Sequence, residues 1–169
     1  GSGSETDPYV ITNASELQSI EDDLLAHYAL GNDINAIETA NWNNKKGFDP
    51  IGDSFSNNFQ GSLHGNGHTI AGLTINRASE DYVGLFGLII GDGYVRNVKR
   101  TNATSTGDQN TGSVAAFTDT SGAFENITVT QADIAGTRQT AGLIGKSQGV
   151  KVINNSFVEA NINGTADVG

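Results

Sequence analysis

Several charged residues in the middle of this sequence are of the types that polysaccharide-cleaving enzymes use. Asp92 and Asp119 are separated by roughly the length of one repeat of this sequence, so they could stack on adjacent coils near Arg96 or Lys99. In such enzymes carboxylates act as general acid or base, and a nearby cation stabilises the developing negative charge. The further candidates of both charges are Asp108, Asp133, Arg100 and Arg138. Asp92 and Asp119 stand in glycine-containing turn sequences, where Asp usually accepts hydrogen bonds from its own backbone, so we favour turn capping and expect no catalytic residue and no enzymatic activity.

Two histidines and three aspartates are the candidates for a metal site. His64 and His68 have the spacing of zinc ligands on a helix, but they flank a Gly-Asn-Gly turn and the chain has no cysteine, so we interpret both as structural. Asp33, Asp49 and Asp53 lie in an irregular N-terminal region and could converge on Ca²⁺, which prefers carboxylate oxygens. The sequence lacks an EF-hand loop and the glycine-rich nonapeptide of calcium-binding β-rolls. We therefore expect no metal and no cofactor, with Ca²⁺ as the open alternative.

Three aromatic residues are the candidates for ligand binding. Trp42, Phe48 and Phe55 are isolated apolar residues in a loop-like segment, residues 35–58, that is rich in Asn and Gly. Aromatic rings in a polar loop can stack on sugars or anchor a protein partner. The alternative, which we favour, is that these rings cover the open end of the first coil, because an uncovered β edge invites pairing with other chains.

The elements that must position these residues repeat along the second half of the chain. Three segments begin with a Gly-apolar-apolar-small step or a close variant of it, and their first glycines are Gly84, Gly112 and Gly142. A second marker, apolar-x-Asn, recurs in the same rhythm at Asn97, Asn126 and Asn155. Both markers return after about 29 residues, and a fixed period in this range indicates stacked supersecondary units. Two markers in phase therefore predict a solenoid.

A winding of about 29 residues has room for three short strands joined by corners. Strands of successive windings would pair in parallel, and parallel crossovers are right-handed, so the predicted fold is an all-β solenoid, a right-handed parallel β-helix. The core between coils is expected to contain the apolar residues near the two markers, namely Leu85, Val114, Leu143, Val95, Phe124 and Ile153. The recurring asparagines are expected to face inward at one corner and to stack as an amide ladder.

The N-terminal part is predicted to cap the solenoid. Asn13 and Glu16 fit a capping box, and Leu17, Ile20 and Leu24 follow at helical spacing, which predicts a helix over residues 14–27. In that interpretation the imidazole of His27 closes the helix at its C-terminal carbonyls. The chain then divides into 1–4, which resembles a cloning scar; 5–58, the capping region with this helix and the loop-rich segment; 59–81, the lead-in strands; and 82–169, three β-helix coils cut at the start of a fourth repeat.

Composition excludes several classes of function. The net charge is −10, with 9 basic and 19 acidic residues. This balance argues against a nucleic-acid partner and against an anionic membrane surface, both of which require Lys and Arg. No stretch approaches the 18 or more apolar residues of a membrane span, so we expect no membrane insertion. The absence of Cys and Met is compatible with an extracellular bacterial protein.

Two of the repeat steps resemble a known motif. Gly84-Leu85-Phe86-Gly87 and Gly142-Leu143-Ile144-Gly145 resemble the GLUG motif, a Gly-Leu-apolar-Gly step of large secreted bacterial proteins. Residues 59–75, with the sequence FQGSLHGNGHTIAGLTI, are similar to the stretch that usually precedes this motif, and residues 14–34 resemble the N-terminal portion of the same proteins.

The middle repeat departs from the GLUG pattern, with Ser113 and Ala115 where Leu and Gly are expected, although Phe124 and Asn126 keep the register. The resemblance implies a parallel β-helix from a filamentous-haemagglutinin-like adhesin, or from the non-catalytic part of a surface protease such as the immunoglobulin A peptidases. It implies no catalytic residue, because the motif is structural in those proteins.

We therefore expect a fragment of a secreted bacterial cell-surface protein, a non-catalytic scaffold or stalk of an adhesin that mediates protein or glycan contact. The alternative is a carbohydrate-active β-helix enzyme, a polysaccharide lyase or hydrolase, because parallel β-helices support both roles. A groove with converging carboxylates and a basic residue would favour the enzyme. The expected partners are another surface protein or glycan, together with end-to-end self-association of the open C-terminal coil.

Overall fold

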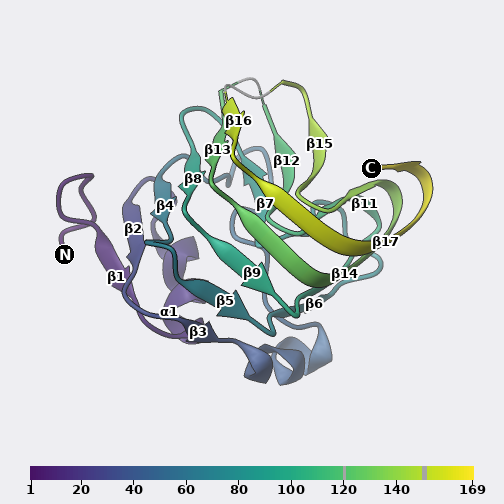
Figure 1. Cartoon of the computed structure of the whole chain (residues 1–169), viewed down its shortest axis with the longest axis horizontal. Helices are drawn as coiled ribbons and strands as arrows, with labels where there is room; N and C mark the ends of the chain where they lie inside the picture. The colour runs from purple at the N-terminus through teal and green to yellow at the C-terminus, as the bar shows by residue number, and fades with distance from the viewer. Residues whose placement is uncertain (120, 150–151) are drawn as a thin grey trace.

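In the computed structural model the chain winds into a parallel β-solenoid (Figure 1). The structure describes residues 1–119, 121–149 and 152–169. Within these residues the strands form three sheets in which strands of successive windings pair in parallel. Each winding is built from short strands joined by polar corners, as expected for a sequence with 22 glycines and few long apolar runs.

The first sheet has the order β1, β2, β4, β8, β13, β16. Its strands are β1 (Tyr9–Ile11), β2 (His27–Leu30), β4 (Ser62–His64), β8 (Tyr94–Arg96), β13 (Ala123–Glu125) and β16 (Val152–Asn154). The third sheet is shorter and contains β7 (Phe86–Ile89), β12 (Ala115–Thr118) and β15 (Ile144–Ser147).

The second sheet bends around the remaining side of the solenoid. Its strands are β3 (Ile34–Asn35), β5 (Thr69–Ala71), β6 (Thr74–Asn76), β9 (Lys99–Thr101), β10 (Thr104–Thr106), β11 (Gln109–Gly112), β14 (Thr128–Ala141) and β17 (Phe157–Val168). The long strand β14 pairs with β9, β10 and β11 of the winding before it and with β17 of the winding after it.

The register between windings repeats at the interval that the sequence markers predict, which confirms the period. In the first sheet Val95 pairs with Phe124, and Phe124 pairs with Ile153. In the third sheet Ala115 pairs with Phe86 on one side and with Ile144 on the other. The solenoid has about four windings, and its stacked part already includes β2 and β4, which precede the repeats that the glycine markers define.

The repeat glycines occupy equivalent points of successive windings. Gly112 donates its N–H to the carbonyl of Val83, which precedes Gly84. A Cβ atom on Gly84 would lie 3.0 Å from the carbonyl oxygen of Gly112, and one on Gly112 would lie 3.0 Å from the carbonyl oxygen of Leu143, which follows Gly142. Glycine therefore lets the backbones of adjacent windings approach where a side chain would collide.

The N-terminal helix is shorter than the sequence predicts. α1 spans Ala14–Gln18 and continues only as a 3₁₀ turn, Ser19–Asp22, so the prediction of a helix over residues 14–27 is wrong at its C-terminal end. His27 begins strand β2 and does not close a helix. The physical reason is that Leu17 and Ile20 already complete the buried face, after which the chain must extend to pair with β1.

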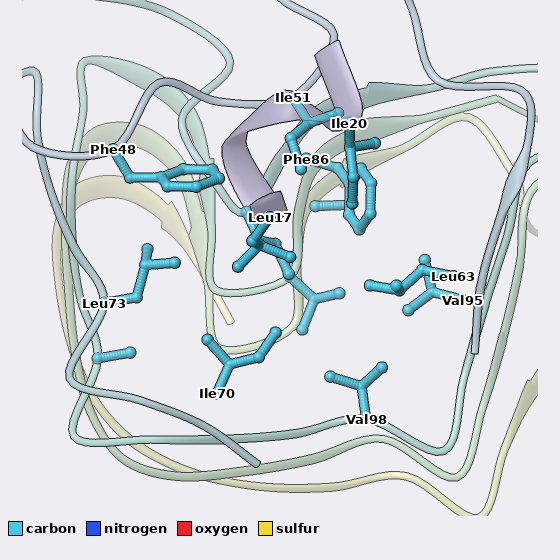
Figure 2. Close-up of a cluster of buried hydrophobic side chains, with 14 of the residues drawn as sticks. Leu17, Ile20, Phe48, Ile51, Leu63, Ile70, Leu73, Phe86, Val95 and Val98 are labelled. Atoms are coloured by element: carbon cyan, nitrogen blue, oxygen red, sulfur yellow. The ribbon is translucent and has the colours of Figure 1, made fainter. Parts of the chain in front are cut away.

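Buried side chains between Ile11 and Ile134 form one continuous core, part of which Figure 2 shows. Leu63 and Val95 stack in the first sheet, Ile70 lies in the second and Phe86 in the third. At the N-terminal end the core is closed by Leu17 and Ile20 of the helical cap together with Phe48 and Ile51 of the loop-rich segment. This segment also contains the 3₁₀ turns Ile37–Asn41 and Asn43–Lys45. The cap therefore removes the apolar surface of the first winding from water.

The recurring asparagines lie at one corner in the left-handed backbone conformation. Asn97, Asn126 and Asn155 have φ angles of 53°, 52° and 49°. The amide nitrogen of Asn126 donates to the side-chain oxygen of Asn97 at 2.7 Å. Asn97 is half-buried, whereas Asn126 and Asn155 are exposed, so the expectation of inward-facing asparagines is wrong. A left-handed residue turns the backbone at the corner, and its side chain points along the outside of that corner.

The C-terminal winding leaves apolar side chains exposed. Ile153 and Phe157 are 50% and 57% exposed, and Val168 is 49% exposed. Figure 1 shows β16 and β17 at the end of the stack opposite to α1. Among the described residues, no helix is long and apolar enough to cross a membrane.

Candidate functional site

The carboxylates that the sequence singles out do not form one cluster. Asp119 accepts hydrogen bonds from the backbone N–H of Gly91 at 3.2 Å and of Ser121 at 3.0 Å, which is the turn-capping role. Asp108 lies between β10 and β11 and accepts a hydrogen bond from the hydroxyl of Thr137, one winding further on. The side-chain amide of Asn161 donates to Asp133 in β14, at 2.8 Å. Asp92 remains as an exposed residue in the turn between β7 and β8.

The basic candidates are equally dispersed. Lys99 is exposed on β9 and Arg138 is exposed on β14, in a different part of the second sheet. Arg100 is fully buried between its register partners Ile70 and Val129. Arg96 is the one member of this set that lines the same surface hollow as Asp92. The structure thus assembles two of the eight charged candidates in one place.

The metal candidates also separate. His64 lies at the end of β4, whereas His68 lies beyond the turn with its Nδ1 atom 3.4 Å from a carboxylate oxygen of Asp33. Asp49 instead forms an ion pair with Arg77 at 3.1 Å. Over residues 1–119, 121–149 and 152–169, no three His, Asp or Glu side chains are grouped so that they could hold a metal ion.

The three aromatic candidates have three different environments. Phe48 is 0% exposed and belongs to the core, so its assignment as a ligand-binding residue is wrong (Figure 2). Trp42 is half-buried and stacks on Phe48 with the ring centres 6.4 Å apart. Phe55 is 58% exposed and makes edge contacts with Tyr82 and Phe117 of later windings. Apolar residues isolated in the sequence are thus used mainly to seal the solenoid.

A groove on the outer face of the first sheet is the best-formed candidate site. We call it the first-sheet groove and define it by six residues, His27, Ser62, His64, Tyr94, Arg96 and Glu125. Its volume is about 850 Å³, and its rim includes Glu5 and Pro8 of the N-terminal segment and Asp92 and Ser121 of two turns. The site therefore draws together segments as far apart in the chain as Glu5 and Glu125.

Strand alternation places these side chains on one face. The second residues of β2, β4, β8 and β13 (Tyr28, Leu63, Val95 and Phe124) are buried and point into the core. The residues on either side of each of these second residues must then point outward. The register sets them in two rows, one of His27, Ser62, Tyr94 and Ala123, and one of Ala29, His64, Arg96 and Glu125.

Tyr94 is the centre of the groove. Its hydroxyl donates a hydrogen bond to the carboxylate of Glu125, and the guanidinium carbon of Arg96 lies 5.5 Å from the centre of its ring. Burial and the hydrogen bond with Glu125 raise the pKa of Tyr94 above its usual value. The phenol therefore stays protonated and acts as a hydrogen-bond donor and an aromatic surface.

The histidines extend the polar rows toward the N-terminal end. The Nδ1 atom of His27 lies 2.8 Å from the hydroxyl oxygen of Ser62, within hydrogen-bond distance. His64 is half-buried beside Arg96, and burial followed by the charge of Arg96 lowers the pKa of His64 below its usual value. His64 is thus neutral at pH 7, and the charges around the groove are the carboxylates of Glu5, Asp92 and Glu125 against the guanidinium of Arg96.

Sequence reasoning missed four of the six groove residues, namely His27, Ser62, Tyr94 and Glu125. A signal for two of them was present. The repeated core residues Val95 and Phe124 are one winding apart, and each has a neighbour on either side in the sequence. Because side chains alternate along a strand, these neighbours point outward and fall into two rows, Tyr94 with Ala123 and Arg96 with Glu125. The N-terminal members carried no such signal, because the first windings depart from the period of the later ones.

The chain has relatives in sequence, although no protein-family model matches it. It is 36% identical over 168 residues to halomucin of Haloquadratum walsbyi, an alignment that covers 95% of this chain and 2% of halomucin. It is 35% identical over 132 residues to a "Putative Gly-rich membrane protein" of Evansella cellulosilytica, over 76% of this chain and 15% of that protein. The chain therefore spans a small part of the curated relatives that it matches.

The fold has a counterpart among solved structures. A crystal structure described as a "putative immunoglobulin A1 protease" from Bacteroides ovatus aligns with a TM-score of 0.69 over 98% of this chain and 49% of that chain. The two sequences are 20% identical in this alignment, so the likeness concerns the fold. The parallel β-solenoid is thus a fold that this chain shares with an experimentally solved protein.

Proposed function

We propose that this chain is a non-catalytic β-solenoid module of an adhesin-like extracellular surface protein, and that it presents the first-sheet groove to a protein or glycan of another surface. Its similarity to a short part of two much longer proteins, one described as halomucin and one as a membrane protein, supports a modular role in such a surface protein. The GLUG-like steps at Gly84 and Gly142 support the same class.

The groove on the outer face of the first sheet is the observation that carries this proposal. Its strands β4, β8 and β13 are paired on both sides and rest on fully buried residues, Leu63, Val95 and Phe124. Side chains on such a face are held in fixed positions, which lowers the entropy lost when a partner binds. A stalk that presents a preformed polar groove is suited to bind a protein or glycan of another surface.

One observation favours an enzyme as the second candidate. Tyr94, Arg96 and Glu125 surround one groove with Asp92 at its rim, and a polysaccharide lyase or hydrolase needs an acid or base beside a cation. Two features of Tyr94 support the non-catalytic role instead. Tyr94 has a raised pKa, which disfavours a phenolate base, and Glu125 already accepts the hydrogen bond of Tyr94.

An activity assay separates the two candidates. The chain is incubated with polygalacturonate, alginate, chondroitin, xylan and cellulose, and reducing ends and unsaturated uronates are measured. We expect no product above that of heat-denatured protein. Product formation that is lost in Arg96→Ala and kept in the control Lys99→Ala, which changes an exposed cation outside the groove, would establish the enzyme.

An adhesion assay tests the contact role. Beads coated with the chain are passed over surfaces that carry glycans or extracellular proteins. We expect the wild-type beads to adhere to at least one such surface and beads with Ala123→Leu to adhere less, because Ala123 is half-buried in an outward row and leucine would fill the groove. Equal adhesion of both beads, or adhesion of neither, would contradict the groove as the contact site.

A further inference from the structure

We infer that the ligand class of the first-sheet groove is a neutral glycan chain. This inference rests on the proposed function, since it names what the contact site binds. It follows from three features of the groove, which are its hollow shape beside one aromatic ring, the kind of hydrogen-bonding groups that it offers, and the sign of its charge.

The shape is set by small residues on both sides of Tyr94. In its row the register partners are Ser62 and Ala123, and the neighbouring row begins with Ala29. Small residues next to a large ring leave the hollow of about 850 Å³ and keep Tyr94 half-buried, with part of the ring accessible. A half-buried ring beside a hollow, with the guanidinium carbon of Arg96 5.5 Å from the ring centre, is an arrangement against which the apolar C–H surface of a pyranose can rest.

The polar groups match the hydroxyls of a sugar. Arg96 has a planar guanidinium that can form two parallel hydrogen bonds to adjacent hydroxyls of a pyranose, and Glu125, which accepts from Tyr94 at one carboxylate oxygen, can accept a further hydrogen bond at the other. His27 and Ser62 add a donor and acceptor pair in the other row. Successive strands are about 4.8 Å apart, which is comparable to the length of one pyranose unit, so a glycan lying along the solenoid axis would meet the side chains of one strand per sugar.

Charge excludes an anionic ligand. Three carboxylates line the site, those of Glu5, Asp92 and Glu125. Among its lining residues in the described part of the chain, Arg96 is the one permanent cation. His64 also lines the site, and its lowered pKa keeps it neutral. The chain as a whole carries a net charge of −10. A uronate polymer or a nucleic acid would therefore be repelled both at the groove and at longer range.

The backbone around the groove disfavours an extended peptide. Such peptides commonly bind by adding a strand to a sheet edge, where unpaired N–H and C=O groups give affinity. β4, β8 and β13 are interior strands of the first sheet, with their backbone hydrogen bonds already made on both sides. The groove offers only side chains, and this favours a ligand that is recognised through its hydroxyls.

Chemical-shift mapping with defined probes tests the inference. The ¹⁵N-labelled chain is titrated with cellohexaose, xylohexaose, mannohexaose and maltohexaose as neutral glycans, with hexagalacturonate as an acidic one, and with hexalysine as a cationic peptide. We expect at least one neutral glycan to shift the amides of residues 62–64, 94–96 and 123–125 saturably. Hexagalacturonate should bind at least about tenfold more weakly, as expected for one unfavourable charge contact.

Four variants make the test specific. Tyr94→Ala should weaken neutral-glycan binding about tenfold or more, and Tyr94→Phe should weaken it less, because it keeps the ring. Ala123→Leu should also weaken binding, although it removes no polar group. Lys99→Ala, on the outer surface of the second sheet, should leave binding unchanged.

The outcomes distinguish this inference from the proposed function. Groove shifts with hexalysine but not with a neutral glycan would overturn the glycan class and keep the groove as a contact site. Hexagalacturonate binding as tightly as the neutral probes would overturn the charge argument and with it the neutral class. Absence of groove shifts with every neutral probe would overturn the inference, while bead adhesion to a protein surface would still support the proposed function.

Discussion

Single asparagines shape one corner of each winding. Asn97, Asn126 and Asn155 hold the left-handed conformation that ordinary residues adopt at a cost, and their amides can bond along the axis. At two further corners the residues are also left-handed, but the residue type there varies from winding to winding. One consists of Asn102 and Gln131, and the other of Tyr82, Asn110, Gln139 and Asp167. The corner geometry is thus maintained along the stack even where the residue type changes.

Substitutions at Asn126 separate the backbone effect from the amide ladder. We expect Asn126→Ala to destabilise the chain by about 1–2 kcal/mol, because alanine is strained in the left-handed region and cannot donate to Asn97. Asn126→Gly should cost only about 0.5–1 kcal/mol, the value of the lost hydrogen bond. Urea unfolding measures both. Equal costs for the two variants would show that the conformation at this corner contributes nothing.

Arg100 is a charged residue at a core position. It is 0% exposed between Ile70 and Val129, and within the described residues its guanidinium nitrogens have no hydrogen-bond partner. Burial lowers the pKa of Arg100 to about 10. A buried ion without a partner is costly, and its replacement by an apolar residue of similar volume is commonly neutral or stabilising.

We therefore expect Arg100→Met to raise the free energy of unfolding by roughly 1–4 kcal/mol, the range found when buried ionic groups are replaced by apolar ones. Thermal and urea unfolding provide the measurement. Arg96→Met, which changes an exposed arginine on the neighbouring strand β8, is the control and should change stability little. A clear loss of stability in Arg100→Met would mean that the guanidinium makes a favourable interaction in the folded protein.

At the scale of elements, the helical cap is held to the loop-rich segment by polar contacts. The side-chain amide of Gln18 donates to the carbonyl of Asp49 at 3.0 Å, and its oxygen accepts the N–H of Asp49 at 2.8 Å. Arg77 lies on the other side of the same loop and pairs with Asp49 and Glu80. Side chains therefore replace backbone pairing where the cap meets the first winding.

Glu21 makes this junction sensitive to pH. Partial desolvation, followed by the negative charges of Asp49 and Asp53, raises the pKa of Glu21 to about 7, although the residue keeps an exposed surface. When the pKa of a carboxyl is higher in the folded state than in the unfolded state, its contribution to stability is fully present at pH values below the unfolded pKa, here near 4.5. That contribution is lost as the pH rises toward the folded pKa of about 7. We expect the melting temperature to fall between pH 5 and pH 8 for this reason.

The variant Glu21→Gln isolates this effect, because glutamine keeps the shape of the side chain without titrating. Its melting temperature should change less between pH 5 and pH 8 than that of the wild type. The exposed residue Asp22 provides the matched control Asp22→Asn, which should leave the wild-type pH dependence in place. An unchanged pH dependence in Glu21→Gln would contradict the assignment.

At the scale of the whole molecule, the two ends of the solenoid differ. The N-terminal end is covered by α1 and the 3₁₀ turn, whose Leu17 and Ile20 are fully buried. At the other end, Ile153 and Val158 pair with the inward-facing Phe124 and Val129 and are 50% and 37% exposed, since no described winding covers them. An open apolar end with unpaired strand edges favours association with another copy.

We expect this chain to form a dimer through its C-terminal winding, and association should stop there because α1 covers the other end. Sedimentation velocity over a concentration series measures the equilibrium. Val158→Lys should shift it to the monomer, whereas the control Glu159→Lys, on an exposed residue of the same strand, should not. A wild-type chain that stays monomeric at every concentration would contradict this expectation.

The sequence by itself determined the periodic features of this protein. The regular spacing of glycine and asparagine markers was sufficient for a parallel solenoid, because each winding repeats the same local geometry and needs only its neighbours. The helix start was also local, since Asn13 accepts the N–H of Glu16 at 2.9 Å as its position in the sequence predicts. The end of the helix was not, because it depends on where β2 must begin to pair with β1.

Only the tertiary structure decided which residues share a surface. The first-sheet groove joins β2, β4, β8 and β13. The number of residues between β2 and β4 depends on the loop-rich segment, which does not follow the repeat, so the pairing of these two strands cannot be found from the period. Burial was equally non-local. Phe48 and Arg100 are an aromatic and a charged residue in polar surroundings of the sequence, yet both are fully enclosed because neighbouring windings and the cap close around them. The period of the sequence specifies which strands stack on each other. Which side chains share an outer face or the core depends on how the windings and the cap pack together in three dimensions.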